Sequence, residues 1–485
     1  MYIPAEYVRP LQALPRLLAE PRTARRVVLS VIGLATLGVM LYVGAAVVDT
    51  VSRDEWRFLP MLREWYAGHF YVQDLFDPNT VQSAHRTPPY KLYLLVNALW
   101  FGLDVRLGCW LGALALGAFA WLLYRHHLRL RPEPATAFDH YAFLPAALAV
   151  FSFAQTHAYS YELLAVFTIP GSVIFAALWM RLDSGRRADA GWRDAALACA
   201  SLLAFVLFGA GKNPALAVAT LVAAGLATFR PDVPPRTRLA RFAWIAAATL
   251  LAELVYWKGN VTSPDLGALL AATFRDLWSA LDYVLHALGA SLVNTDAFLG
   301  LAPARQSLLL TLLGGVVLAA AGGALVVYLR TRLYRRSVLP IAFAVFVALY
   351  LGELLVGRYG EGTLNGGSPR YVYTDHLLIL GCVLVFADLA RGWHRAGRRR
   401  AAAALLAGLT LTVVSVEAFN VYTAAVNLRF GVHAQELGVA AAKARLAGGK
   451  QPYPAWYCPD RQACDEGTRL LAEHRLNFMR QDTKP

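Results

Sequence analysis

The chain contains a long series of apolar runs, each about 20 residues long and nearly free of charged side chains. A run of this length crosses a bilayer as a helix, because a helix satisfies its own backbone N–H and C=O groups. Composition agrees: 57% of the residues are hydrophobic, 16% are charged, and the mean hydropathy is +0.44. Soluble domains carry about 25% charged residues. The sequence therefore predicts an all-α, polytopic transmembrane helix bundle rather than a soluble enzyme.

About eleven such runs are expected to be spans. They lie near 27–48, 105–124, 141–156, 163–180, 195–210, 214–229, 240–257, 307–329, 338–356, 372–389 and 401–424. Two further segments, 89–101 and 266–288, have helical apolar spacing and are expected to lie in the membrane interface within outer loops. Either of them taken as a span would move the C-terminal tail to the other face.

Arginine-rich loops predict the orientation. Alternate loops are short and rich in cations, and together they hold about half of the 46 Lys and Arg residues. Such loops are cytoplasmic by the positive-inside rule, so the net charge of +14 reports orientation and excludes a nucleic-acid partner. The expected parts are a cytoplasmic N-terminal segment 1–26, a membrane body 27–424 with its first outer loop at 49–91, and a small extracytoplasmic segment 425–485.

The two ends of the chain carry separate expectations. The first apolar run starts late and is longer than the core of a signal peptide, so it is expected to be retained as a span. Cys458 and Cys464 lie close together in the polar tail and are expected to form a disulfide if the tail is outside the cytosol. The alternative is a metal pair, but no second Cys/His pair with zinc spacing accompanies them, so no metal site is predicted.

The first outer loop carries a pair of acids, Asp54 and Glu55, directly before Trp56. Burial and the like charge raise the pKa of one member of such a pair, which suits a general base. The alternative is an interfacial loop whose acids pair with Arg53 and Arg57. Asp49 is a rival base, because it lies deeper.

Two groups of cations are expected on the outer face. The first is His85, Arg86 and Lys91, and the second is Lys212, Arg358 and Arg370, with several glycines between residues 360 and 367. Arginine binds phosphate through two parallel hydrogen bonds, and lysine adds a point charge. Both groups are therefore candidate ligands for the phosphate of a lipid-linked donor. The alternative is unspecific contact with lipid head groups or solvent.

A tight outer turn carries the fourth group of candidate residues. These are His157, Tyr159, Tyr161 and Glu162. Aromatic residues at the end of a span usually anchor a helix in the interface, and contact with a sugar is the functional alternative.

Three motifs resemble the GT-C class of membrane glycosyltransferases, which use polyprenyl-phosphate-linked sugars. The motifs are Asp54-Glu55-Trp56 after the first span; Ser83-Ala84-His85-Arg86 with Lys91-Leu92, Asn97 and Phe101-Gly102-Leu103-Asp104; and Gly367-Ser368-Pro369-Arg370-Tyr371 before a late span. The chain departs from the class at Ala84, where an acid precedes the His-Arg pair in many bacterial members.

The resemblance implies a catalytic acid in the first outer loop, Asp54 or Glu55, and donor phosphate held by Arg86, Lys91 or Arg370. The residues expected to contact substrate are Trp56, His157, Tyr159, Glu162 and Tyr371. We expect a multi-pass protein of the bacterial inner membrane, active on the periplasmic face and in contact with membrane lipids. The acceptor is a glycan, a lipid or a protein. No cofactor is certain, and a divalent cation is left open.

Two other functions stay open at this point. An oligosaccharide polymerase or O-antigen-type ligase would depend on Arg358 and Arg370 rather than on Asp54. A lipid-linked glycan flippase or other transporter would carry charged residues along a path through the spans, with inverted repeats. Here the polar residues gather at one face, which favours an enzyme.

Overall fold

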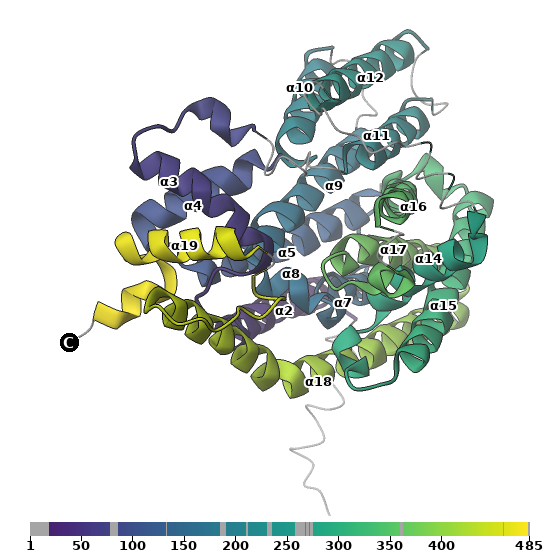
Figure 1. The fold of residues 1–485 in the computed structure, drawn as a ribbon. Helices are drawn as coiled ribbons and strands as arrows, with labels where there is room; N and C mark the ends of the chain where they lie inside the picture. Colours follow the sequence, from purple (N-terminus) through teal and green to yellow (C-terminus); the bar gives the residue numbers. More distant parts are fainter. Residues whose placement is uncertain are drawn as a thin grey trace, which may run out of the picture.

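The computed structural model describes residues 19–77, 86–131, 133–184, 191–209, 212–229, 235–257, 267, 271, 275–358, 362–458 and 460–483. Within these residues the chain forms helices and no strand (Figure 1), which confirms the all-α prediction. Nine helical stretches of the described chain are long and apolar enough to cross a membrane: Pro21–Ala46, Val105–Arg129, Ala137–Ser160, Leu164–Asp183, Arg238–Tyr256, Pro303–Arg330, Leu339–Gly357, Pro369–Arg395 and Arg399–Leu446. Two shorter apolar helices, Asp194–Phe208 and Asn213–Thr228, coincide with the fifth and sixth predicted spans.

The elements follow one another along the chain as short and long helices. The first half contains α2 (Pro21–Ala46), η1 (Arg53–Phe58), α3 (Leu59–Tyr66), η2 (Val72–Leu75), α4 (Pro88–Phe101), α5 (Val105–Arg129), α6 (Ala137–Tyr141), α7 (Leu144–Val150), η3 (Phe153–Gln155), α8 (Thr156–Ser160), η4 (Leu164–Thr168), α9 (Ile169–Ser184), α10 (Gly191–Phe208) and α11 (Asn213–Thr228). The second half contains α12 (Pro235–Trp257), α14 (Leu277–Leu292), η5 (Thr295–Phe298), α15 (Pro303–Arg330), η6 (Leu333–Arg335), α16 (Leu339–Arg358), η8 (Thr363–Gly367), α17 (Val372–Arg395), α18 (Arg399–Leu446), α19 (Arg461–Glu473) and η9 (Asn477–Thr483).

The third predicted span is broken rather than continuous. Its stretch, Ala137–Ser160, consists of α6, α7, η3 and α8. The Ser152 hydroxyl accepts from the backbone N–H of Ala154 at 3.2 Å, and the hydroxyl of Tyr159 donates to the Ser152 carbonyl at 2.7 Å. These side chains satisfy backbone groups that the break would otherwise leave without partners, which a membrane requires.

The arginine-rich ends of the helices meet on one face of the bundle. Arg391 on α17 pairs with Asp139 on α6 at 2.9 Å, and Arg131 after α5 pairs with Asp388 at 3.2 Å. Asp183 on α9 accepts the backbone N–H of Val338 before α16 at 3.0 Å. Loops that the charge pattern assigned to the cytoplasm therefore lie together and are joined by buried ion pairs.

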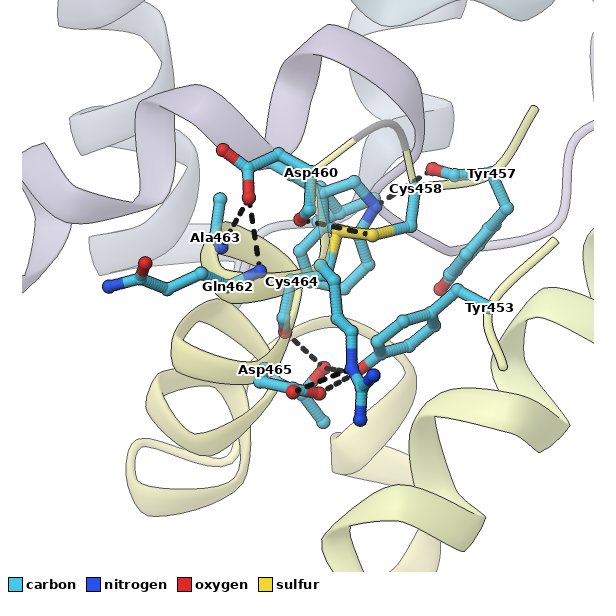
Figure 2. Close-up of a disulfide and its surroundings, with 12 residues drawn as sticks. Tyr453, Tyr457, Cys458, Asp460, Gln462, Ala463, Cys464 and Asp465 are labelled. Atoms are coloured by element: carbon cyan, nitrogen blue, oxygen red, sulfur yellow. Dashed lines mark hydrogen bonds and ion pairs between the residues drawn. A yellow bond between two sulfur atoms is a disulfide. The ribbon is translucent and has the colours of Figure 1, made fainter. Parts of the chain in front are cut away.

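The opposite face holds the first outer loop and the C-terminal tail. Helix α18 has 48 residues, so it is about 72 Å long and extends beyond any bilayer. No proline interrupts it, which is why it continues past 424, where the membrane body was expected to end. Beyond it, α19 lies beside α3 (Figure 1). A disulfide joins Cys458 to Cys464, with the two Cα atoms 6.3 Å apart (Figure 2).

Helix α14 covers part of the segment that was expected at the interface. The described helix runs Leu277–Leu292 and packs against α15 and α17. The two helices α14 and α15 approach closely at two glycines: a Cβ on Gly289 would lie 2.2 Å from the Leu310 carbonyl oxygen, and one on Gly314 would lie 2.0 Å from that of Leu285. Small residues allow this close packing between membrane helices. The helix is thus joined to the bundle.

Candidate functional site

A cavity of about 330 Å³ lies on the face that carries the first outer loop and the tail. Its walls come from the end of α2, the start of η1, α8, η5, the outer part of α18 and the tail. Among the lining side chains are Arg53, His157, Tyr161, Asp296 and Trp456. Segments far apart in the sequence therefore build one polar cavity.

Arg53 has the least usual backbone in this cavity. Its φ is 55°, in the left-handed region that side chains with a Cβ rarely adopt. Its N–H donates to the Tyr457 carbonyl at 2.7 Å, which holds the residue in this conformation. The guanidinium then lies over the ring of Tyr161, 5.8 Å from the ring centre. Strained residues of this kind gather at functional sites because the surrounding structure must stabilise them.

Arg370 is the second cation near Arg53. Burial lowers the pKa of Arg53; the negative charges of Glu55 and Asp54 oppose this shift, and the positive charge of Arg370 adds to it. Arg370 also lies over the ring of Tyr371, 4.9 Å from its centre. In the part of the chain that the structure describes, neither guanidinium forms an ion pair with a carboxylate. The charge of Arg53 also acts on Asp296 across the cavity, so cationic and acidic side chains both face this space.

Asp54 lies at the edge of this site. It forms an ion pair with Arg57 at 3.2 Å, and its side chain is 37% exposed. Burial raises the pKa of Tyr161 well above its usual range, and the negative charge of Asp54 adds to this effect. Asp54 is thus partly exposed and directly follows Arg53, which lines the cavity.

Glu55 points into the protein. It is 4% exposed, and its carboxylate accepts the N–H of Ser52 at 3.0 Å in a capping box at the start of η1. Burial raises its pKa to about 8. The two neighbouring acids therefore have opposite environments, and Glu55 supports the start of the turn that carries Asp54.

Three residues expected to contact substrate are instead buried in packing contacts. Glu162 accepts from Tyr93 at 2.7 Å and from Asn97 at 3.2 Å. Tyr159 donates to a backbone carbonyl, and Trp56 is fully buried with its indole N–H donating to Tyr457 at 3.0 Å. These side chains hold α4, α8 and the tail in place. Of the aromatic turn, His157 and Tyr161 reach the cavity.

Arg86 and Lys91 of the first cationic group are not among the residues that line the cavity. The amine of Lys91 donates to the carbonyls of Asp74 and Asp77, both at 2.8 Å, and closes the loop before α4. Arg86 donates to the Val255 carbonyl at 3.3 Å. His85 lies outside the described residues.

The residues of the second cationic group lie in different places. Arg370 acts on Arg53 through its charge but, like the buried Tyr371, does not line the cavity, whereas Lys212 is half-buried at the start of α11, where its amine donates to Thr374 at 2.9 Å and lies over the Tyr350 ring. Burial lowers the pKa of Lys212 to about 8. The side chain of Arg358 lies outside the described part.

The sequence interpretation missed Arg53, Asp296 and Trp456 as site residues. Arg53 was considered only as an ion-pair partner for the acids, although it stands directly before Asp54. Asp296 and Trp456 are brought to the cavity by long-range folding, and no local pattern marks them. Among the described residues no group of three His, Cys, Asp or Glu side chains could hold a metal ion.

Comparisons of the chain with protein-family models, with curated proteins and with solved structures return no match.

Proposed function

We propose that this protein is a GT-C-type glycosyltransferase with eleven spans, working in the bacterial inner membrane on its periplasmic face. It would move a sugar from a polyprenyl-phosphate donor to a glycan, lipid or protein acceptor. One observation carries the proposal. Arg53 lines a polar cavity and experiences the charge of Arg370, neither guanidinium forms an ion pair with a carboxylate in the described chain, and the part-exposed acid Asp54 directly follows Arg53.

The two guanidinium groups suit the phosphate of the donor. As the bond between sugar and phosphate breaks, negative charge grows on the departing phosphate, and fixed cations stabilise that charge. Burial makes such an interaction stronger than it would be in water, because the local dielectric constant is lower. Arg53 and Arg370 are therefore the proposed phosphate ligands.

Asp54 suits the role of general base. The acceptor must lose a proton as it attacks the sugar, and a carboxylate within hydrogen-bond reach can take it. Glu55 lacks the access that this step requires, since its carboxylate is buried in the cap of η1. In this reaction the sugar C–O bond to phosphate breaks, a new bond to the acceptor oxygen or nitrogen forms, and the proton passes to Asp54.

An apolar groove is the proposed binding site for the lipid part of the donor. It has a volume of about 710 Å³ and lies between α14, α15, α16 and α17. On α17 it begins at Leu378, which is about 9 Å along the helix from its first residue, Val372, and Arg370 stands two positions before that residue. A polyprenyl chain attached to a phosphate at Arg370 could therefore enter this groove.

Sugar transfer by the purified protein tests the proposal. We expect Asp54→Asn to lower kcat at least 100-fold with little change in donor affinity, as for loss of a general base. Arg370→Met should instead weaken binding of undecaprenyl phosphate by tenfold or more, because it removes a charged hydrogen-bond donor. Glu64→Gln, an exposed acid in the same loop, is the control.

The same variants distinguish the proposed glycosyltransferase from an oligosaccharide polymerase or O-antigen-type ligase. If Asp54→Asn keeps full turnover while Arg370→Met abolishes it, the protein joins glycans without this base. If wild-type protein binds no undecaprenyl phosphate, the proposed function is wrong.

A further inference from the structure

The C-terminal tail forms part of the wall of the candidate cavity. Trp456 lines the cavity and keeps 40% of its surface exposed. The next residue, Tyr457, is fully buried, and its ring meets that of Trp456 edge-on at 5.8 Å. The indole of Trp456 is therefore accessible from the cavity, and the buried Tyr457 beside it holds it in place.

Tyr457 also holds the first outer loop. Its carbonyl accepts two hydrogen bonds, from the N–H of Arg53 at 2.7 Å and from the indole of Trp56 at 3.0 Å. Its hydroxyl bonds to that of Thr50 at 2.8 Å. The left-handed backbone of Arg53 is thus stabilised by a residue about 400 positions away in the sequence.

The disulfide fixes this part of the tail. Cys458 follows Tyr457 directly and is bonded to Cys464 on α19 (Figure 2). Helix α19 is itself anchored: Asp465 pairs with Arg445 of α18 at 2.5 Å, and a Cβ on Gly467 would lie 2.9 Å from Trp56. Trp456 and Tyr457 are therefore held between a covalent link and two packed helices.

We propose that the tail completes the donor site. The face of Trp456 receives the sugar ring of the donor, and the disulfide keeps the Tyr457 carbonyl in the position that holds Arg53. This inference rests on the proposed function, because it takes the phosphate to lie at Arg53. Trp456 would be a specificity-determining residue, and Tyr457 and the disulfide would position Arg53.

The chemistry of a sugar ring fits this surface. A pyranose presents C–H groups on one face, and these pack on the negatively charged face of an indole. The hydroxyl groups at the ring edge are left for polar partners, and His157 and Asp296 line the same cavity. A sugar joined to a phosphate at Arg53 would lie within the walls that Trp456 helps to form.

The test compares two kinds of lipid in binding measurements on the full-length protein. The sugar-free probe is undecaprenyl phosphate, and the glycosylated probes are its esters with glucose, galactose, mannose and arabinose. For the tightest glycosylated probe, we expect Trp456→Ala to weaken binding about tenfold and Trp456→Phe much less. The same two variants should bind the sugar-free probe within about twofold of wild type. Trp65→Ala, with a similarly exposed indole in the same outer region, is the control.

The double variant Cys458→Ser/Cys464→Ser should weaken both kinds of probe about tenfold, because it acts through Arg53. A general loss of folding would also lower the amount of monodisperse protein, so the thermal midpoint is measured beside affinity. The inference is overturned if Trp456→Ala weakens both probes equally, or if no glycosylated probe binds wild type more tightly than the sugar-free one. The proposed function fails separately, if wild type binds neither probe or if Arg53→Met binds both as wild type does.

Discussion

Two adjacent acids, Asp54 and Glu55, differ in burial and therefore in chemistry. Asp54 is accessible and paired with Arg57, whereas Glu55 is buried and caps η1. Pairs of carboxylates in contrasting environments often divide a task between them. Here the division is between a group that can meet the acceptor and a group that shapes the loop. The sequence could predict the pair, but only the turn of η1 decides which acid faces outward.

Glu55 should make the stability of the protein depend on pH. Its pKa is raised from 4.5 to about 8 by burial, so the folded protein keeps a proton that the unfolded chain has lost between these values. Stability therefore falls as pH rises from about 5 to 8, by up to about 1.4 kcal/mol per pH unit. Glu55→Gln should flatten this slope when thermal midpoints are measured in detergent. Burial also raises the pKa of Glu162, so part of the slope should remain; an unchanged slope would contradict the assignment.

The backbone and the side chain of Arg53 can be tested separately. Arg53→Gly and Arg53→Ala both remove the guanidinium and should weaken binding of undecaprenyl phosphate to a similar extent, about tenfold. They should differ in stability, because at a φ of 55° alanine is strained and glycine is not. We expect the glycine variant to be more stable by about 1 kcal/mol in unfolding measurements. Equal stability of the two variants would show that the left-handed backbone is not retained.

Among the elements, helix α16 supplies one wall of the apolar groove. The groove leads to a prediction about the polyprenyl chain of the donor. A side chain added at Gly352 would enter open space, and Gly352 lines the groove. Gly352→Leu should therefore fold normally and raise KM for an undecaprenyl donor about tenfold. A donor with a geranyl chain, which ends before the groove, should keep its KM. Gly315→Leu on α15 also enters open space but lies outside the groove, so it is the matched control. If Gly352→Leu changed KM equally for the undecaprenyl and the geranyl donor, the polyprenyl chain would not lie in this groove.

Elements were predicted well where a local pattern is enough. Apolar runs of membrane length gave the long helices, and the segment before Gly102 was correctly expected to be a short helix, α4. The local sequence pattern was insufficient where backbone N–H and C=O groups find their hydrogen-bond partners in side chains outside the helix. The break after α7 needs the Ser152 hydroxyl and the Tyr159 side chain, and α18 continues to Leu446 because nothing in its sequence ends it. The buried partners of Lys91 and Lys212 likewise follow from tertiary packing, which charge alone does not reveal.

At the scale of the whole molecule, the contact between the tail and the first outer loop requires an even number of membrane crossings between these two segments. Arg480 pairs with Asp49, and Asn477 donates to Asp49 at 2.9 Å, so the two segments lie on the same face. The arginine-rich loops lie together on the other face. A topology that sends the tail alone to the cytoplasm would break these contacts and would put the disulfide in a reducing compartment.

Labelling of single cysteines tests this arrangement in intact cells. Glu64→Cys in the first outer loop and Lys450→Cys after α18 are both exposed, as is Arg398→Cys before α18. We expect a membrane-impermeant maleimide to label the first two in intact cells and the third only after the cells are opened. The variants are built on Cys199→Ser, since Cys109 and Cys382 are buried and the tail cysteines are bonded to each other. If Lys450→Cys behaved like Arg398→Cys, the tail could not reach Arg53, and the site assembled from both segments would not exist.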